Sequence, residues 1–223
     1  MSAPEPSVQE MSEYLGRVYG GDGGLLTRQK RLVSIYRPYY SPVGELLRHI
    51  HDGARVLEIG CGTGPILFLL ARFGEIAAGR GLDINREAIR IATAINTHSD
   101  LSFATDSCYA LSASDVDVYD VILCFDVLHH LPRAEKRRFL EHLVSIIRPG
   151  GRIILKDLDR RPWRKAFANR ITDYLSTRSI VSYWSREEAV CFFKDQGLHV
   201  VAEFPCEDWV WSHYMVIAEQ RDL

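Results

Sequence analysis

Two adjacent histidines, His129 and His130, come directly after one of the most apolar runs of the chain. The preceding segment 120–124 carries Val-Ile-Leu and predicts a strand that is buried on both faces. A neutral imidazole accepts a proton near physiological pH, so either histidine could act as a general base for a substrate hydroxyl. His213, at the start of the last predicted strand, is another candidate base.

A second candidate functional segment is the glycine-rich run 60–64, which reads Gly-Cys-Gly-Thr-Gly after the apolar run 56–59. Glycine at alternate positions removes the Cβ atoms from a short turn, so the backbone can approach a ligand and adopt positive φ. Asp83 follows 19 positions after Gly64, at the end of a second apolar run. An open α/β sheet places a carboxylate there, on the two hydroxyls of a ribose. The segment therefore predicts a site for an adenosine-containing cofactor.

Two residues beside the loop indicate which cofactor it accepts. The dinucleotide fingerprint requires a third glycine at position 65, whereas this chain has Pro65, which offers no N–H to a pyrophosphate. Glu58 precedes the loop and would repel a diphosphate, but it suits a cation. S-adenosylmethionine (SAM) carries an ammonium and a sulfonium group and no phosphate. The same two residues disfavour the alternative, an NAD(P)-dependent oxidoreductase.

The run 56–64, with Asp83 behind it, resembles the cofactor loop of class I SAM-dependent methyltransferases, and the resemblance extends over about residues 50–157. It implies that the loop faces the methionine half of SAM and that Asp83 accepts both ribose hydroxyls. It also implies contacts with the adenine from Ile84 and the pair 106–107. The implied cofactor-binding residues are Glu58, Gly60, Cys61, Gly62, Gly64, Asp83, Ile84, Asp106, Ser107, Phe125 and Asp126.

Structural roles remain open for several of these residues. Asp83 could cap a helix or face solvent, and Asp106 could form a turn. One of the two histidines could bind the methionine end of SAM or a backbone carbonyl, with the other solvated.

Strand and helix patterns alternate along the chain after residue 50. The expected strands are 55–59, 77–82, 101–104, 120–124, 152–157, 198–204 and 213–219, and the expected helices include 65–73, 86–98 and 133–147. Such alternation predicts a parallel, doubly wound sheet. Together with the resemblance, it predicts an α/β fold: a mostly parallel seven-stranded sheet with a C-terminal antiparallel strand pair and helices on both faces. Residues 1–48 are expected to form a mobile segment and cap helices, and residues 49–223 the SAM-binding domain.

The acceptor is expected to bind residues outside the region of resemblance, where aromatic side chains are dense. Between residues 148 and 178, nine Lys and Arg stand against three Asp, and a basic helix is expected at about 160–178. That helix is either a lid packed on the core or a surface for a membrane or an acyl carrier protein. The residues expected to contact the acceptor are Tyr40, Trp163, Tyr183, Trp184, Trp211 and His213.

The charge and cysteine content of the chain indicate which binding partners are disfavoured. A formal net charge of −2 gives no general attraction to nucleic acid. The five cysteines show no zinc-ligand spacing, so we expect no metal site and a reducing compartment. The N-terminus lacks the pattern of a signal peptide, and no apolar run reaches the ~18 residues of a membrane span. A cytoplasmic protein is expected.

These features predict an enzyme that transfers a methyl group from SAM to a small or lipid-like acceptor at oxygen, including carrier-bound aromatic or polyketide acceptors. The segment 124–127 lacks the Asn/Asp-Pro-Pro-aromatic sequence of amino-group methylases, which disfavours exocyclic N-methylation. Three alternatives remain: a quinone-type C-methyltransferase, an RNA or protein methyltransferase that uses the basic stretch 148–178, and a SAM-binding protein without catalysis.

Overall fold

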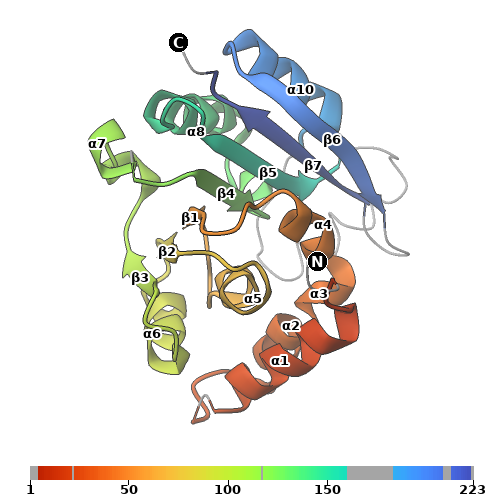
Figure 1. Cartoon of the computed structure of the whole chain (residues 1–223), viewed down its shortest axis with the longest axis vertical. Coiled ribbons are helices and arrows are strands. Elements are labelled where there is room, and N and C mark those ends of the chain that lie inside the picture. The colour runs from red at the N-terminus through yellow and green to blue at the C-terminus, as the bar shows by residue number, and fades with distance from the viewer. Residues whose placement is uncertain (1–4, 22, 117, 160–182, 208–211, 222–223) are drawn as a thin grey trace. The chain divides into compact units, whose positions relative to one another are not determined.

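The fold is described from a computed structural model, which covers residues 5–21, 23–116, 118–159, 183–207 and 212–221. The chain divides into two compact units, Met1–Ser107 and Cys108–Leu223. Figure 1 traces both along the chain from red to blue. Each unit is described by itself.

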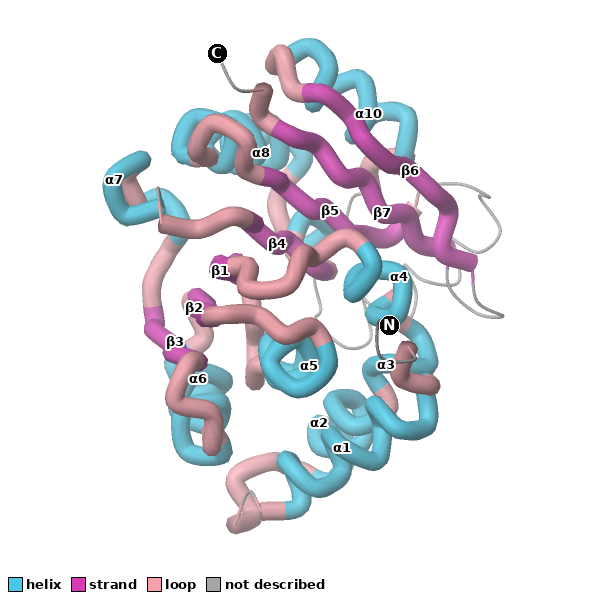
Figure 2. Tube along the Cα trace, in the orientation of Figure 1, coloured by secondary structure: helices cyan, strands magenta, loops and turns pink. Residues whose placement is uncertain are grey.

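The first unit contains three parallel strands, which lie in the order β3-β2-β1. They are β1 (Arg55–Ile59), β2 (Ala78–Asp83) and β3 (Leu101–Thr105). Two helices connect them, α5 (Pro65–Phe73) and α6 (Arg86–Ile95), and they lie beside the strands in Figure 2. The predicted bounds of β1 and α5 are confirmed residue for residue, and β2, β3 and α6 differ only at their ends.

Helix α6 begins where the sequence predicts, because Asn85 caps it. The side-chain oxygen of Asn85 accepts the backbone N–H groups of Glu87 and Ala88. Its buried residues are Ile89, Ile91, Ala92 and Ile95.

Among the described residues before β1 there are four helices: α1 (Val8–Gly20), α2 (Arg28–Ile35), α3 (Arg37–Tyr40) and α4 (Val43–Arg48). The sequence predicts a mobile segment and cap helices over residues 1–48 and gives no bounds for α1. A capping box between Ser7 and Glu10 starts α1, and its inner face buries Met11, Leu15 and Tyr19. Pro38 lies in the first turn of α3, where proline starts a helix rather than interrupting one.

The described part of the second unit contains four strands in the order β4-β5-β7-β6. They are β4 (Val121–Phe125), β5 (Arg152–Leu158), β6 (His199–Glu207) and β7 (Ser212–Glu219). β4 and β5 are parallel, whereas β7 pairs antiparallel with both β5 and β6. Every residue of β4 is buried, as its continuous apolar run predicts.

The described helical segments of the second unit are the 3-10 turns η1 (Cys108–Ala110) and η2 (Leu128–His130) and the helices α7 (Ala113–Val116), α8 (Arg133–Ile146) and α10 (Arg186–Asp195). Helix α10 packs on β6 and β7, beside them in Figure 1. A capping box between Ser185 and Glu188 starts it.

Taken together, the strands have the order β3-β2-β1-β4-β5-β7-β6. The predicted α/β fold, with a mostly parallel seven-stranded sheet and a C-terminal antiparallel pair, is confirmed. Within the described parts of the chain, every helix is too short or too polar to cross a membrane.

Candidate functional site

The glycine loop has the backbone geometry that its sequence predicts. Gly60, Gly62 and Gly64 have φ of 74°, 55° and 84°, a region that strongly favours glycine. Gly64 is the N-cap residue of α5, which begins at Pro65. The loop thus turns from β1 into α5 with its backbone uncovered by side chains at three of five positions.

Gly64 also lies too close to Phe103 to carry a side chain. An added Cβ would lie 2.8 Å from the ring of Phe103, in addition to the strain of a φ of +84°. We expect Gly64→Ala to lower the free energy of unfolding by about 2–3 kcal/mol, since both costs apply. Gly53→Ala is the matched control, because Gly53 has a φ of +75° and nothing within 4 Å of an added Cβ. Urea unfolding of both variants measures the difference, and equal losses would contradict the contact with Phe103.

Asp83 holds the loop from the end of β2. Its Oδ2 accepts the N–H of Gly62 at 2.8 Å, and its Oδ1 accepts the N–H of Asn85 at 2.8 Å. A carboxylate has about four acceptor positions, so each oxygen retains capacity for a ligand hydroxyl. The carboxylate therefore joins the loop to the start of α6 and can still accept from a ribose.

Glu58 is a buried carboxyl behind the loop. The residue is only 2 % exposed, and its Oε2 has no hydrogen-bond partner among the described residues. Burial raises its pKa to about 8, although the nearby charge of Arg37 acts in the opposite direction. An unpartnered oxygen on a buried acid is costly, and a cationic ligand would compensate it, so the contact of Glu58 with SAM stays a prediction.

Cys61 lies in the loop as a buried thiol. Burial raises its pKa well above the ordinary value, and the charges of Glu58 and Asp83 raise it further. The thiol therefore stays protonated, which favours a pocket-lining role over a reactive thiolate.

The residues expected near the adenine follow β2 and β3. Ile84 is 79 % exposed, so its side chain is accessible to a ligand, and its contact with the adenine stays a prediction. Asp106 accepts the N–H of Ser107 at 2.8 Å through its Oδ1. This bond fits the turn-forming role and leaves the adenine contact as a prediction.

Sequence analysis did not identify the residues of the N-terminal helices that contact the loop. Tyr19 on α1 donates its hydroxyl to the carbonyl of Thr63 at 3.0 Å, and it is fully buried. Ser34 on α2 reaches the hydroxyl of Thr63 at 3.3 Å. Both contacts join residues far apart in sequence, so no local pattern indicates them.

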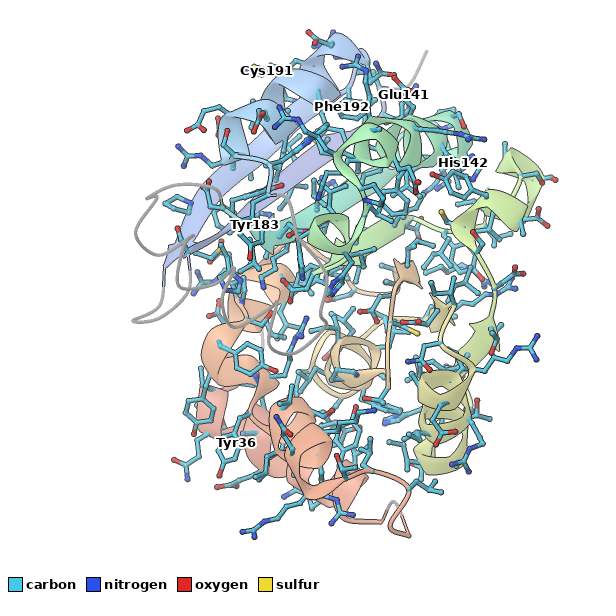
Figure 3. All side chains as sticks on the ribbon, turned by 180° about the vertical axis from the view of Figure 1, so that it is seen from behind. Tyr36, Glu141, His142, Tyr183, Cys191 and Phe192 are labelled. Carbon is cyan, nitrogen blue, oxygen red and sulfur yellow. The ribbon has the colours of Figure 1, made fainter. Side chains whose placement is uncertain are left out.

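In the second unit, η2 carries the two histidines, and Asp157 of β5 holds the first of them. His129 Nδ1 lies 2.8 Å from Asp157 Oδ1, and the backbone N–H of His129 donates to Asp157 Oδ2 at 3.0 Å. Both residues are buried. The rings of His129 and His130 are 4.0 Å apart, and Tyr183, labelled in Figure 3, lies 6.3 Å from the His129 ring.

Asp126, predicted to bind the cofactor, forms an ion pair in the structure. Its Oδ1 lies 2.6 Å from Nζ of the fully buried Lys156, and its backbone has a φ of 56°. The neighbouring Phe125 is buried at the end of β4. Asp126 thus compensates a buried charge, and its contact with SAM stays a prediction.

The described residues among those expected to contact the acceptor belong to both units, and their contact with the acceptor stays a prediction. Tyr40 donates its hydroxyl to the carbonyl of Val33 at 2.6 Å, and Trp184 packs on Phe192, 5.9 Å between ring centroids. The ring of Tyr183 lies 6.3 Å from the ring of His129, a candidate base. His213 is buried on β7. Trp163, Trp211 and the predicted basic helix 160–178 lie outside the described residues. Of the basic stretch 148–178, residues 148–159 are described.

A family model described as a methyltransferase domain matches residues 33–203, well over half of the chain. The chain therefore belongs to the methyltransferase domain family. The resemblance to class I SAM-dependent methyltransferases, which the loop and Asp83 indicate, is confirmed, and the oxidoreductase alternative is not supported.

Individual relatives agree with this assignment. The ubiquinone biosynthesis O-methyltransferase of Aeromonas salmonicida is 30% identical over 112 residues, which are 49% of this chain and 45% of that protein. The chain spans about half the length of the curated relatives that it matches first.

Solved structures show the same fold. Magnesium protoporphyrin IX methyltransferase from Synechocystis PCC 6803 with bound SAH has a TM-score of 0.66 at 18% identity, with 93% of each chain covered. A SAM-dependent methyltransferase from Methanosarcina mazei has a TM-score of 0.63 at 19% identity, covering 79% of this chain and 97% of that chain.

Proposed function

We propose that this methyltransferase uses SAM to methylate a hydroxyl oxygen of a small or lipid-like acceptor. The observation that carries the choice of SAM is the buried carboxyl of Glu58, whose Oε2 lacks a partner among the described residues, directly before three glycines of positive φ. A dinucleotide would bring a diphosphate to this carboxyl, whereas SAM brings positive charge. Family membership supports the same choice.

The residues of this chain would bind the cofactor and transfer the proton as follows. The loop backbone and Glu58 would hold the methionine half, and Asp83 would accept the ribose hydroxyls with its remaining acceptor positions. SAM supplies an electrophilic methyl group on its sulfonium. His129 would take the proton of the acceptor hydroxyl as the oxygen forms its bond to the methyl carbon and the carbon–sulfur bond breaks. The bonding electrons go to sulfur, which leaves S-adenosylhomocysteine.

Most of the rate is expected to come from alignment and exclusion of water. The reaction neutralises a sulfonium charge, so a water-poor site favours it, and holding the reactants in line can supply about 7–11 kcal/mol. A general base adds about 10²–10⁴-fold. His129 meets the structural requirements for that base, because it is buried and oriented by a carboxylate.

Two observations support an oxygen acceptor. The segment after β4 lacks the Asn/Asp-Pro-Pro-aromatic sequence of amino-group methylases. The curated relatives are named as O-methyltransferases of ubiquinone biosynthesis. A quinone-type ring carbon is the second candidate, since the same relatives have a quinone product in their name. A carrier protein or a membrane surface as partner stays a prediction.

The test has two stages. Calorimetry compares SAM with NADH, and we expect saturable binding of SAM and none of NADH. Purified protein is then incubated with methyl-labelled SAM and three acceptor groups: catechols and phenols, quinols with a free ring carbon, and total RNA. Label on a phenol or catechol oxygen supports the proposal. Label on ring carbon or RNA, or binding of NADH in place of SAM, contradicts it.

A further inference from the structure

We propose that Asp157 is a positioning residue that fixes the His129 imidazole with its hydrogen on Nδ1, so that Nε2 is the proton-accepting atom. The catalytic meaning of this assignment rests on the proposed methyl transfer. The assignment of the hydrogen itself does not, because it concerns the geometry of two side chains within the second unit.

The hydrogen-bond pattern determines the tautomer. Asp157 Oδ1 accepts the N–H of Leu158 at 2.6 Å and lies 2.8 Å from His129 Nδ1, while Oδ2 accepts the N–H of His129 at 3.0 Å. Burial raises the pKa of Asp157, but the His129 charge and hydrogen bonds outweigh it, so the pKa is lowered overall. An ionised carboxylate can only accept, so the hydrogen between the pair belongs to Nδ1. The lone pair of the neutral ring is then on Nε2.

The segment that carries His129 is held on several sides. Successive residues of β5 point to opposite faces: Lys156 pairs with Asp126, and Asp157 pairs with His129. From α8, the buried Nζ of Lys136 donates to the carbonyl of Leu128. A ring on a segment held in this way keeps one orientation, which general-base catalysis requires.

Several titratable groups surround the pair and enter any account of its pH dependence. They are His130 on η2, Asp126 after β4, Lys156 on β5, Lys136 on α8, Tyr183 before α10 and Tyr214 on β7. The Asp157 carboxylate lies 2.8 Å from Nδ1 of the His129 ring, so the loss of this carboxylate is expected to have the largest effect on that ring.

A purely structural role for Asp157 is the competing explanation, since it also accepts two backbone N–H groups. Lys136→Met distinguishes the two. It also loosens the segment, by removing the donor to Leu128, but it removes a positive charge near Asp157 instead of the carboxylate. Its effect on the protonation of His129 is therefore opposite in sign to that of Asp157→Asn.

The experiment is long-range ¹H–¹⁵N NMR of the histidine rings in the full-length protein, with His129→Gln used to assign the resonances. In the unmodified protein at alkaline pH, we expect the Nδ1–H tautomer for His129. Asp157→Asn should populate the Nε2–H tautomer and lower the titration midpoint of the ring, because Asn can donate to Nδ1 and carries no charge. Lys136→Met should keep the tautomer and leave the midpoint unchanged or higher. An Nε2–H tautomer in the unmodified protein, or identical spectra of His129 in Asp157→Asn, would overturn the assignment.

An activity measurement adds the catalytic readout. With any acceptor that the labelling screen identifies, Asp157→Asn should lower kcat by about 10²–10⁴-fold while the SAM dissociation constant stays unchanged. A parallel loss of SAM binding would overturn the positioning role. If no acceptor is methylated, the proposed function fails, whereas the NMR result still decides the tautomer.

Discussion

Replacing Asp83 by alanine is expected to lower the affinity for SAM by about 10²- to 10⁴-fold and to leave the chain folded. The expected loss follows from two charge-assisted hydrogen bonds to the ribose, worth about 1.5–3 kcal/mol each. The variant also loses the acceptors of the Gly62 and Asn85 N–H groups. Asp83 is partly exposed, so water can replace it and the cost to folding is about 1–2 kcal/mol. Calorimetric titration with SAM measures the affinity, and thermal unfolding without ligand measures the stability.

Two further variants separate the ribose contact from the loop contact. Asp83→Asn keeps one acceptor oxygen and loses the charge, so we expect an intermediate affinity. Asp100→Ala removes an exposed carboxylate of the same unit that accepts the hydroxyl of the neighbouring Ser99, while the backbone carbonyl of Asp100 is retained. This variant should bind SAM like the unmodified protein. An Asp83→Ala protein that binds SAM normally would remove the ribose assignment. A protein that fails to bind because it is unfolded would instead place Asp83 with the structural residues.

The sequence predicts well the parts of the fold whose causes are local. The bounds of β1 and α5 follow from an apolar run, three glycines and Pro65, each of which acts on its own backbone. β4 follows from an apolar run that needs burial on both faces. The bounds of helix α1 were not predicted although the pair Ser7 and Glu10 is visible in the sequence, because the segment begins with polar residues and prolines. Much of what holds it is distant in sequence, such as the contact of Tyr19 with Thr63.

The candidate site likewise contains some residues that the sequence indicates and others that it does not. The loop and Asp83 were found because their residue types and spacing are informative in themselves. Asp157, Lys156 and Lys136 were missed, because Lys and Asp are ordinarily surface residues and their partners lie 28, 30 and 8 positions away. A sequence cannot indicate that a lysine is fully buried until the chain that covers it is known. Asp126 shows the converse, since its family position suggests a ligand contact while the structure gives it an ion pair.

Glu58 leads to the second prediction with a large effect: SAM binding near pH 7 releases close to one proton. In the ligand-free protein the pKa of Glu58 is about 8 because the carboxyl is buried, so it is mainly protonated at pH 7. The positive charge of SAM favours the ionised form and expels the proton. Calorimetry in buffers of different ionisation enthalpy measures the release. SAM affinity should therefore rise with pH until about pH 8 and then level off.

Glu58→Gln removes this proton release and lowers SAM affinity by about 10- to 100-fold, since the cation loses its charged partner. The same substitution should stabilise the ligand-free protein at alkaline pH, although it weakens SAM binding. The folded pKa of Glu58 is raised above the unfolded value, so its contribution to stability is present below about pH 4.5 and is lost as the pH rises through about 8. Above pH 8 the buried charge costs on the order of 5 kcal/mol, and the ligand-free variant should be more stable than the unmodified protein by a similar amount.

Glu87→Gln is the control, because Glu87 is exposed on α6 and pairs with Arg90. It should leave the proton release, the SAM affinity and the alkaline stability unchanged. Proton release that persists in Glu58→Gln would assign the titrating group elsewhere. A Glu58→Gln protein that binds SAM as tightly as before would show that the carboxyl does not face the cation. A site that is costly to keep charged when empty and favourable when filled is a general feature of preorganised binding, and in this chain one carboxyl carries both effects.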